Sequence, residues 1–211
     1  MIFVFNGPPG SGKDICCDYL KTKGFIHIEF KEQLFADTIE YFGVTPEWFF
    51  DGYTRDNKDV KEELLENRSR REALIFISEQ VMKPKYGQGY YGFKASEKMT
   101  QDKDYCISDG GFVSELKEII NKFGADEIRI IRLYRNGYDY SHDSRKYVNF
   151  EEVEKTYICG YETDTTELQK QCFDETVPVK GNIIHNNSNM SDLYLSVEDI
   201  LRNSNVRKNS Q

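Results

Sequence analysis

The order of the apolar segments predicts an α/β protein with a mostly parallel, five-stranded sheet flanked by helices. Short apolar runs, which are typical of buried strands, alternate along the chain with segments whose apolar residues recur every three or four positions. Strands and helices that alternate in this way favour a parallel sheet covered on both faces. The 211 residues are enough for one such domain, which we expect over residues 1–204, with a frayed polar tail over 205–211.

The first half of the chain supplies two of the expected strands and most of the expected helices. An apolar run at residues 2–5 ends in a Gly/Pro turn, and the pair Ile15 and Tyr19 indicates a helix over 13–21. A second strand at 25–28 precedes a helix that ends near Gly43. Residues 44–59 show no clear period, and helix is expected to resume over 59–82 and, after a break at 83–87, in a short piece up to about 99.

The second half repeats the alternation. Strands are expected at residues 105–107, 128–133 and 182–185, with an amphipathic helix over 112–123. A closing helix over 193–201 is expected to be capped by Ser191. The polar stretch 135–181 is left unassigned. In a parallel sheet, ligands bind beyond the carboxyl ends of the strands, so functional residues are expected just after each strand.

Composition and charge exclude several classes of protein. The formal net charge of −8 disfavours nucleic acid or an anionic membrane as a partner. No apolar run is long enough to span a membrane, and the first residues lack the basic start of a signal peptide. The five cysteines form no CxxC pair, so we expect reduced thiols in a cytoplasm. A homodimer is compatible with the sequence.

The turn after the first strand carries the strongest signal. Residues 7–13 (GPPGSGK) fit the phosphate-binding pattern GxxxxGK, with a strand before them and a helix after them. Glycines let backbone N–H groups approach phosphate oxygens, and the lysine adds a full positive charge. The alternative is a turn that only joins strand to helix. The expected nucleotide-binding residues here are Gly7, Gly10, Ser11, Gly12, Lys13, Asp14 and Ile15.

Asp14 departs from the usual pattern, in which a Ser or Thr follows the lysine and binds Mg²⁺. A carboxylate is an equally suitable ligand for this hard cation. Alternatively, Asp14 is an acid that favours the first turn of a helix. Asp109, directly after the third strand, is the candidate second carboxylate of a metal site or a group that orients the acceptor; alternatively it is a turn residue in Asp-Gly.

Arginines and aromatic residues supply further candidates. On a helix, Arg68, Arg70 and Arg71 cannot all face one ligand, so we expect one of them to bind a monophosphate. Alternatively, all three form a solvated basic face. The segment from about 134 to 160, with Arg135 and Arg145, is a candidate lid that would bring arginines to a transferring phosphoryl group, or alternatively a disordered loop. The aromatic patch that includes Trp48 would stack a nucleobase or belong to the core.

Several of these pieces resemble the deoxynucleoside monophosphate kinases of tailed bacteriophages, within the P-loop nucleoside monophosphate kinases. The loop ends in GKD, as in that family, and residues 69–74 (SRREAL) with 87–91 (GQGYY) resemble its SPR-x-x-L helix followed by a glycine and an aromatic pair. Residues 108–115 (SDGGFVSE) are similar to its D-x-R-F-x-x-E, and 142–145 (HDSR) to its H-x-S-E. The segment 183–187 (IIHNN) resembles its loop near the nucleotide base. Gly111 stands where the family has Arg, and Arg145 where it has Glu.

The resemblance implies a P-loop kinase with a substrate-binding insertion at about 30–100 and a lid at about 134–160. The implied reaction moves the γ-phosphoryl group of ATP to a (deoxy)nucleoside monophosphate, with Mg²⁺, in a cytoplasm, that of the host if the source is viral. The alternatives are another small-molecule or nucleic-acid acceptor, or a non-catalytic regulatory nucleotide-binding protein. The expected catalytic residues are Lys13, Asp109, Arg132, Arg135 and Arg145; Asn186 and Asn187 join the nucleotide site; Lys31, Trp48, Arg70, Arg71, Tyr91 and Glu115 bind the acceptor; Asp14 and Asp109 bind the metal.

Overall fold

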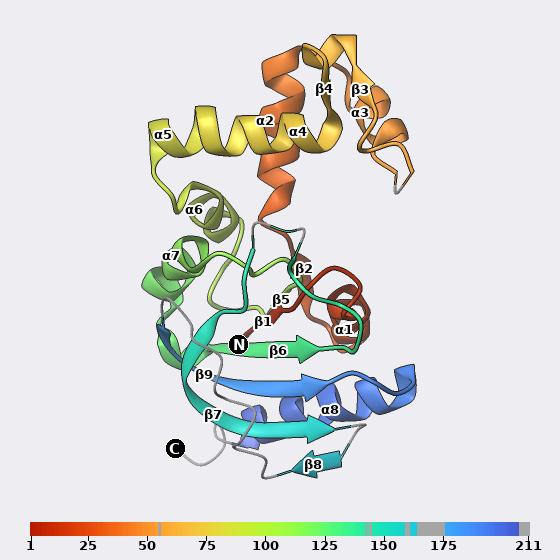
Figure 1. Ribbon diagram of the computed structural model, residues 1–211. Helices are drawn as coiled ribbons and strands as arrows, with labels where there is room; N and C mark the ends of the chain where they lie inside the picture. The colour runs from red at the N-terminus through yellow and green to blue at the C-terminus, as the bar shows by residue number, and fades with distance from the viewer. Residues whose placement is uncertain (55, 142, 144, 159–160, 164–175, 207–211) are drawn as a thin grey trace.

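The computed structural model describes residues 1–54, 56–141, 143, 145–158, 161–163 and 176–206. Its central element is a seven-stranded sheet with the strand order β2-β5-β1-β6-β9-β7-β8 (Figure 1). The strands are β1 (Ile2–Asn6), β2 (Ile26–Ile28), β5 (Tyr105–Ile107), β6 (Ile128–Tyr134), β7 (Asn149–Ile158), β8 (Tyr161–Thr163) and β9 (Thr176–His185). All neighbours pair in parallel except β7 and β8, which are antiparallel.

The predicted α/β fold with a mostly parallel sheet is confirmed, but the predicted number of five strands is wrong. The two additional strands, β7 and β8, come from the polar stretch that the sequence left unassigned. β7 pairs with β9 through register shifts between Phe150 and Glu152 and between Val153 and Lys155. Such irregularities break the alternation of apolar and polar residues by which a strand is recognised. Residues 149–158, which the sequence assigns to the expected lid, therefore belong to the sheet.

Both faces of the sheet are buried against helices. In β1, Phe3 and Phe5 pack with α1 (Lys13–Lys21) and α8 (Met190–Val206), whereas Ile2 and Val4 pack with α6 (Tyr90–Glu97) and α7 (Val113–Phe123). This two-sided burial explains why β1 is a continuous apolar run rather than an alternating one. Each strand thereby holds the residue that follows it at one edge of the sheet.

A second, mainly helical part is formed by residues 31–97, with α2 to α5 at the top of Figure 1 and α6 below them, beside α7. It contains α2 (Lys31–Phe42), α3 (Pro46–Gly52), β3 (Lys61–Glu62), η1 (Glu63–Leu65), β4 (Arg68–Ser69), α4 (Arg70–Phe76), the π-helical segment η2 (Ile77–Met82), α5 (Lys83–Tyr86) and α6. These elements occupy the place in the chain where a substrate-binding insertion was expected.

The helix expected from residue 59 begins only at Arg70, because a hairpin precedes it. Glu66 and Asn67 have φ angles of 54° and 60°, so the chain turns there instead of continuing as a helix. Ser69 then caps α4: its hydroxyl accepts from the Glu72 N–H, and the Glu72 carboxylate accepts from the Ser69 N–H. The sequence pattern Ser-x-x-Glu marks this start.

The end of the chain differs from the expectation in two ways. α8 begins at Met190, and Asn189, not Ser191, caps it by accepting from the Asp192 N–H at 3.0 Å. α8 continues to Val206, and the rest of the expected tail lies outside the described residues. A short η3 (Ala125–Glu127) links α7 to β6. Within the described ranges, no helix combines the length and the apolar composition that a membrane crossing requires.

Candidate active site

The loop between β1 and α1, residues 7–12, contains two positions whose backbone conformation favours glycine. Gly10 and Gly12 have φ angles of 82° and 107°, in the left-handed region. At Gly7, a Cβ atom would lie 2.7 Å from the carbonyl oxygen of Leu133, and at Gly12 one would lie 2.6 Å from Asn186 Nδ2. Of the two glycines in the GxxxxGK pattern, Gly12 is therefore favoured by conformation and by space, and Gly7 by space.

This loop presents hydrogen-bond donors and a positive charge. No side chain caps α1 at Gly12, so the first N–H groups of the helix have no partner within it. The Ser11 hydroxyl is buried without a hydrogen-bond partner among the described residues. The Lys13 ammonium curls back and donates to the Pro8 carbonyl at 2.7 Å. Burial, and then the charge of Arg145, lower the pKa of Lys13 to about 8, although nearby carboxylates oppose this.

Residues after β6 and β9 hold the loop from outside. Arg135 donates to the Gly10 carbonyl and Asn186 to the Ser11 carbonyl, both at 2.8 Å. Tyr138 packs against Gly10, where a Cβ atom would lie 2.3 Å from its ring. Asn187 accepts from the Asn136 N–H at 2.7 Å and so ties the segment after β6 to the one after β9. Asn186 and Asn187, which the sequence predicts for the nucleotide site, and Arg135, which it predicts to be catalytic, thus lie beside the loop, just beyond the strands.

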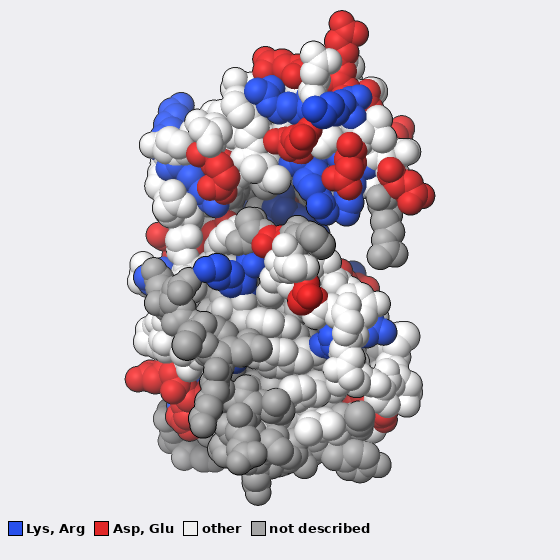
Figure 2. Space-filling model, in the orientation of Figure 1, with Lys and Arg blue, Asp and Glu red and all other residues white. Residues whose placement is uncertain are grey.

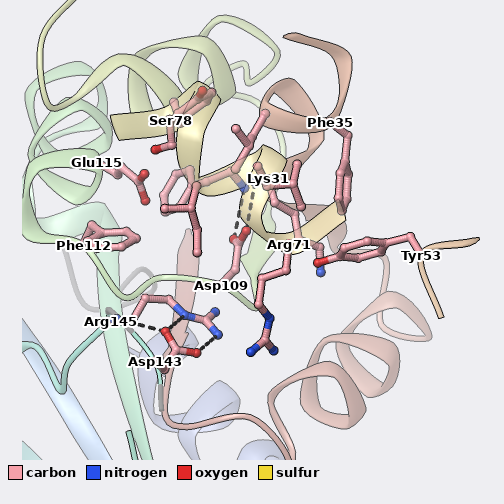
Figure 3. A pocket seen from close by; sticks show the side chains of 15 residues that line it. Lys31, Phe35, Tyr53, Arg71, Ser78, Asp109, Phe112, Glu115, Asp143 and Arg145 are labelled. Atoms are coloured by element: carbon pink, nitrogen blue, oxygen red, sulfur yellow. Dashed lines mark hydrogen bonds and ion pairs between the residues drawn. The ribbon is translucent and has the colours of Figure 1, made fainter. Parts of the chain in front are cut away.

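A cavity of about 250 Å³ lies between the sheet edge and the helical part (Figure 3). It is lined by six of the predicted site residues, Lys31, Arg71, Tyr91, Asp109, Glu115 and Arg145, together with Phe30, Leu34, Phe35, Tyr53, Leu74, Ile75, Ser78, Phe112 and Asp143. Figure 2 shows Lys and Arg side chains gathered at this level, where the helical part meets the part that contains the sheet. The cavity combines apolar walls with charged groups from five separate segments.

One end of the cavity is cationic. Arg145 forms two hydrogen bonds with the Asp143 carboxylate, from Nε at 2.9 Å and from Nη2 at 2.6 Å, which leaves the remaining guanidinium N–H groups for another anion. Burial would lower the pKa of Arg145, but Asp143 outweighs it and keeps the guanidinium charged. Arg71 is half exposed and lies 3.4 Å from Asp59, and Lys31 lies 2.7 Å from Glu29. Figure 3 places Arg71 and Arg145 on the same side of the cavity.

Asp109 anchors the start of α2. Its two carboxylate oxygens accept from the N–H groups of Phe30 and Lys31, each at 3.0 Å. Burial raises the pKa of Asp109, against the opposing effect of these two N–H groups. Asp109 thus fixes Lys31 at the edge of the cavity, and this structural role uses both of its oxygens.

The other end of the cavity carries uncharged or poorly solvated polar groups. Glu115 is 4% exposed and has no hydrogen bond or ion pair within the described part of the chain. Burial, followed by the charge of Asp109, raises its pKa to about 8. Tyr91 is 2% exposed, and its hydroxyl is likewise buried without a partner among the described residues. Ser78 adds a hydroxyl that donates to Glu79 at 2.9 Å.

Three other predicted site residues, Trp48, Arg70 and Arg132, line neither this cavity nor the loop and instead stabilise other parts of the fold. Arg70 is 3% exposed; it donates to the carbonyls of Trp48 and Phe49, pairs with Glu62 at 2.8 Å and stacks on the Trp48 ring. This contact occupies Trp48 as well. Arg132 is buried beneath the segment before β7, donates to the Val148 carbonyl at 2.6 Å and lies over the Phe150 ring. We therefore do not assign Arg70, Trp48 or Arg132 to ligand binding.

Other residues at the site were not singled out from the sequence. Asn6 ends β1 and is 1% exposed; its side chain donates to the carbonyls of Gly110 and Lys146 and accepts from the Val148 N–H. Asp143 positions Arg145. Of the aromatic patch predicted from the sequence (Trp48, Phe49, Phe50 and Tyr53), Tyr53 lines the cavity and Trp48 does not. A polar residue at the end of a fully apolar strand is the signal that would have identified Asn6. His142 and Ser144, which belong to the H-x-S-E resemblance, lie outside the described residues.

A metal site made by protein groups alone is not present: no group of three His, Cys, Asp or Glu side chains converges within the described residues. Asp14 is exposed at the start of α1, beside the loop, and no side chain in the described part of the protein engages it there. One free carboxylate together with phosphate oxygens and waters is a donor set that suits Mg²⁺. Asp14 fits such a role, whereas Asp109 is already engaged by α2.

Comparisons of the chain with models of protein families and with curated proteins gave no match.

Proposed function

We propose that this protein transfers the γ-phosphoryl group of ATP to a nucleoside monophosphate, with a deoxynucleotide as the favoured acceptor on the basis of the sequence resemblance. The observation that supports this most directly is the proximity of the loop to the cavity. Arg145, Asp143 and Asp109 all line the cavity, and all three lie close enough to Lys13 for their charges to affect its pKa. A donor bound at the loop and an acceptor bound in the cavity would therefore meet at Lys13.

The donor side of the reaction uses the loop. The uncapped N–H groups of α1 and the Lys13 ammonium are suited to the β- and γ-phosphates, because an uncapped helix N-terminus and a lysine both favour anions. Lys13 would exchange its bond to the Pro8 carbonyl for a phosphate oxygen, and Ser11 offers a further hydroxyl. Arg135, held at the Gly10 carbonyl, places a second cation above the loop.

The acceptor side uses the cavity. Arg145, Arg71 and Lys31 form a cationic end that matches the charge of a monophosphate, and a guanidinium binds such a group through paired N–H donors. Phe35, Leu74 and Phe112 supply apolar walls that suit a sugar and a base. The net charge of −8 makes this local group of cations the part of the chain best suited to an anionic substrate.

The chemistry requires positioning and charge more than a covalent partner. A phosphate oxygen of the acceptor attacks the γ-phosphorus, the bond between this phosphorus and the β–γ bridging oxygen breaks, and ADP leaves. Lys13 and Arg145 would stabilise the charge that develops on the transferring group. A bound Mg²⁺ would neutralise phosphate oxygens, and Asp14 is the residue placed to hold it directly or through a water.

The test is to incubate the protein with Mg-ATP and a panel of ribo- and deoxynucleoside monophosphates, and to follow the formation of ADP and of nucleoside diphosphates. We expect both products in equal amounts with at least one acceptor. A matched Lys13→Met variant should stay folded and lose ATP binding by at least about tenfold, because it removes a charge-assisted phosphate contact. ATP binding without transfer to any member would overturn the proposal and favour a regulatory role, and unchanged ATP affinity of Lys13→Met would contradict the assignment of the loop.

A further inference from the structure

The end of the cavity opposite the cations contains two buried polar groups that have no partner among the described residues. The Glu115 carboxyl lines the cavity with no hydrogen bond or ion pair among the residues that the structure describes. The Tyr91 hydroxyl, from α6, is buried beside it and is likewise unpaired within that part of the chain. Unpaired buried polar groups cost free energy, so their presence next to open space indicates a ligand that satisfies them.

The positions of these two groups are fixed by close packing of α6 against α7. A Cβ atom at Gly92 would lie 2.1 Å from the carbonyl oxygen of Glu115, so the two helix backbones touch at the level of both side chains. Glycine at this position brings Tyr91 and Glu115 to the same wall. A rigid pair of polar groups of this kind favours recognition of a defined ligand edge, because little side-chain entropy is lost on binding.

The cavity therefore has two chemically different ends. Figure 3 shows Glu115 and Ser78 on one side, and Arg71, Arg145 and Asp143 on the other, with Phe112 on the wall near Glu115. A ligand that suits both ends carries an anionic group at one end and a flat or apolar body with a polar edge at the other. A nucleoside monophosphate has this arrangement of phosphate, sugar and base.

We propose that Glu115 and Tyr91 recognise the base of the acceptor, with the Glu115 carboxyl bonding to an N–H donor and an adjacent acceptor on the base edge. This inference rests on the proposed function, since it takes the ligand of the cavity to be the nucleotide that receives the phosphoryl group. Tyr91 adds one further hydrogen bond to the same edge. Both are binding residues that act on affinity and base preference.

The charged groups around Glu115 determine how it binds. Asp109 and, from η2, Glu79 raise its pKa in addition to burial, whereas Lys83 of α5 and Arg145 lower it. Tyr91 of α6 is the other titratable group beside it. With a pKa of about 8, the carboxyl holds a proton at pH 7 and offers one donor and one acceptor. The proton can sit on either oxygen, so either order of donor and acceptor on a base can be matched. We therefore expect the site to accept more than one base.

The experiment compares nucleoside monophosphates with deoxyribose 5-phosphate, which lacks a base, by direct binding without ATP. We expect Glu115→Met to weaken nucleotide binding by about tenfold and to leave the affinity for the sugar phosphate unchanged, because one or two hydrogen bonds to the base are lost. Tyr91→Phe should show the same selective loss to a smaller extent. Equal weakening for both ligands, or no weakening for either, would overturn the assignment of the base end.

A second variant separates the role of Glu115 from any defect in folding. Glu115→Gln keeps an acceptor oxygen and an NH2 donor group side by side, without a titrating proton. At pH 7 we expect this variant to bind nucleotides as tightly as the wild type does. At pH 9, where the wild-type carboxyl is ionised, we expect the variant to bind them more tightly than the wild type does. If Glu115→Gln instead loses binding at pH 7, the proposed hydrogen-bonding pattern is wrong. Transfer by the wild type without any change of base preference in the variants would refute this inference alone, whereas absence of transfer to every acceptor would refute the proposed function.

Discussion

The side chain of Arg145 lies against Gly111, in the space that any larger residue at position 111 would need. A Cβ atom on Gly111 would lie 2.7 Å from both Cβ and Cδ of Arg145. These are the two positions at which residues 108–115 and 142–145 depart from the kinase patterns that they resemble. The departures are thus one structural feature: the glycine makes room for an arginine that arrives from another segment and is oriented by Asp143.

The first prediction follows from this contact. Gly111→Ala should push Arg145 out of its position, because the added methyl group would overlap three atoms of its side chain. We expect the KM for the acceptor to rise by about tenfold, the cost of one misplaced charge-assisted contact, with ATP affinity unchanged. Steady-state kinetics with each substrate varied in turn provide the measurement.

A double-mutant cycle identifies the cause. If Gly111→Ala acts by displacing Arg145, the double variant with Arg145→Ala should be no worse than Arg145→Ala alone. Additive losses would mean that Gly111 matters through another contact.

The second prediction concerns the residue after the loop lysine. Asp14→Ala should raise the Mg²⁺ concentration needed for half-maximal activity several-fold, because the exposed carboxylate beside the loop is the proposed protein ligand. Asp14→Ser should restore part of this loss, since a hydroxyl oxygen is also a suitable ligand. Activity measured across a Mg²⁺ titration tests both variants.

Asp18→Ala is the matched control on the same helix. Asp18 is exposed and pairs with Lys21 at 3.1 Å, one turn beyond Asp14. It should show the Mg²⁺ dependence of the wild type. An equal shift in Asp14→Ala and Asp18→Ala would point to a general effect of net charge and exclude direct ligation.

The parts of the fold that were predictable are those where a local pattern and the tertiary environment agree. β1, buried on both faces, is a continuous apolar run, and the glycines of the adjoining loop are favoured by φ or by space. β7 escaped recognition because its register shifts and its partly exposed face remove the regular alternation. The hairpin before α4 depends on two residues with positive φ that are not glycine, which no simple pattern reveals.

Residue type alone does not distinguish arginines that line the cavity from those that are buried in the fold. Arg70 and Arg71 are neighbours on one helix, yet Arg70 is buried against Trp48 and Glu62 whereas Arg71 lines the cavity. The difference is one of helix phase, which is set by how α4 packs and not by its sequence. Position after a strand was more informative, since Asp109 and Asn186 both lie at the sheet edge, although Asp109 serves mainly to anchor α2.

The third prediction concerns Asn6, which joins three segments around the site. Asn6→Ala should lower the free energy of unfolding by about 2 kcal/mol, because it leaves the Gly110 and Lys146 carbonyls and the Val148 N–H without their partner. The KM for the acceptor should rise as well, since the segment that carries Arg145 loses this anchor. Asn203→Ala, which removes only an exposed bond to Asp199, should change stability by less than about 0.5 kcal/mol. If urea unfolding shows the same loss of free energy of unfolding for Asn6→Ala and Asn203→Ala, the proposed role of Asn6 is wrong.

The fourth prediction is a dependence of stability on pH that comes from Glu115. Its pKa is raised in the folded protein, from the ordinary value of 4.5 to about 8, so the folded state binds this proton more tightly than the unfolded state does. Between these two values, deprotonation is easier in the unfolded chain, and the stabilising contribution of the group is lost as the pH rises. The slope from this one group is at most about 1.4 kcal/mol per pH unit.

Glu115→Gln removes the titration and should flatten this slope. The free energy of unfolding of the variant minus that of the wild type should therefore be larger at pH 8 than at pH 5.5. Urea unfolding of both proteins at both pH values measures this difference. The control is Glu97→Gln, which changes an exposed glutamate that pairs with Lys94 and should keep the slope of the wild type. Parallel pH profiles for the wild type and Glu115→Gln would mean that the Glu115 carboxyl is already ionised in the folded state. The carboxylate would then present two hydrogen-bond-accepting oxygens to the cavity, which suits a base edge with two N–H donors. This would narrow the expected range of nucleotide substrates.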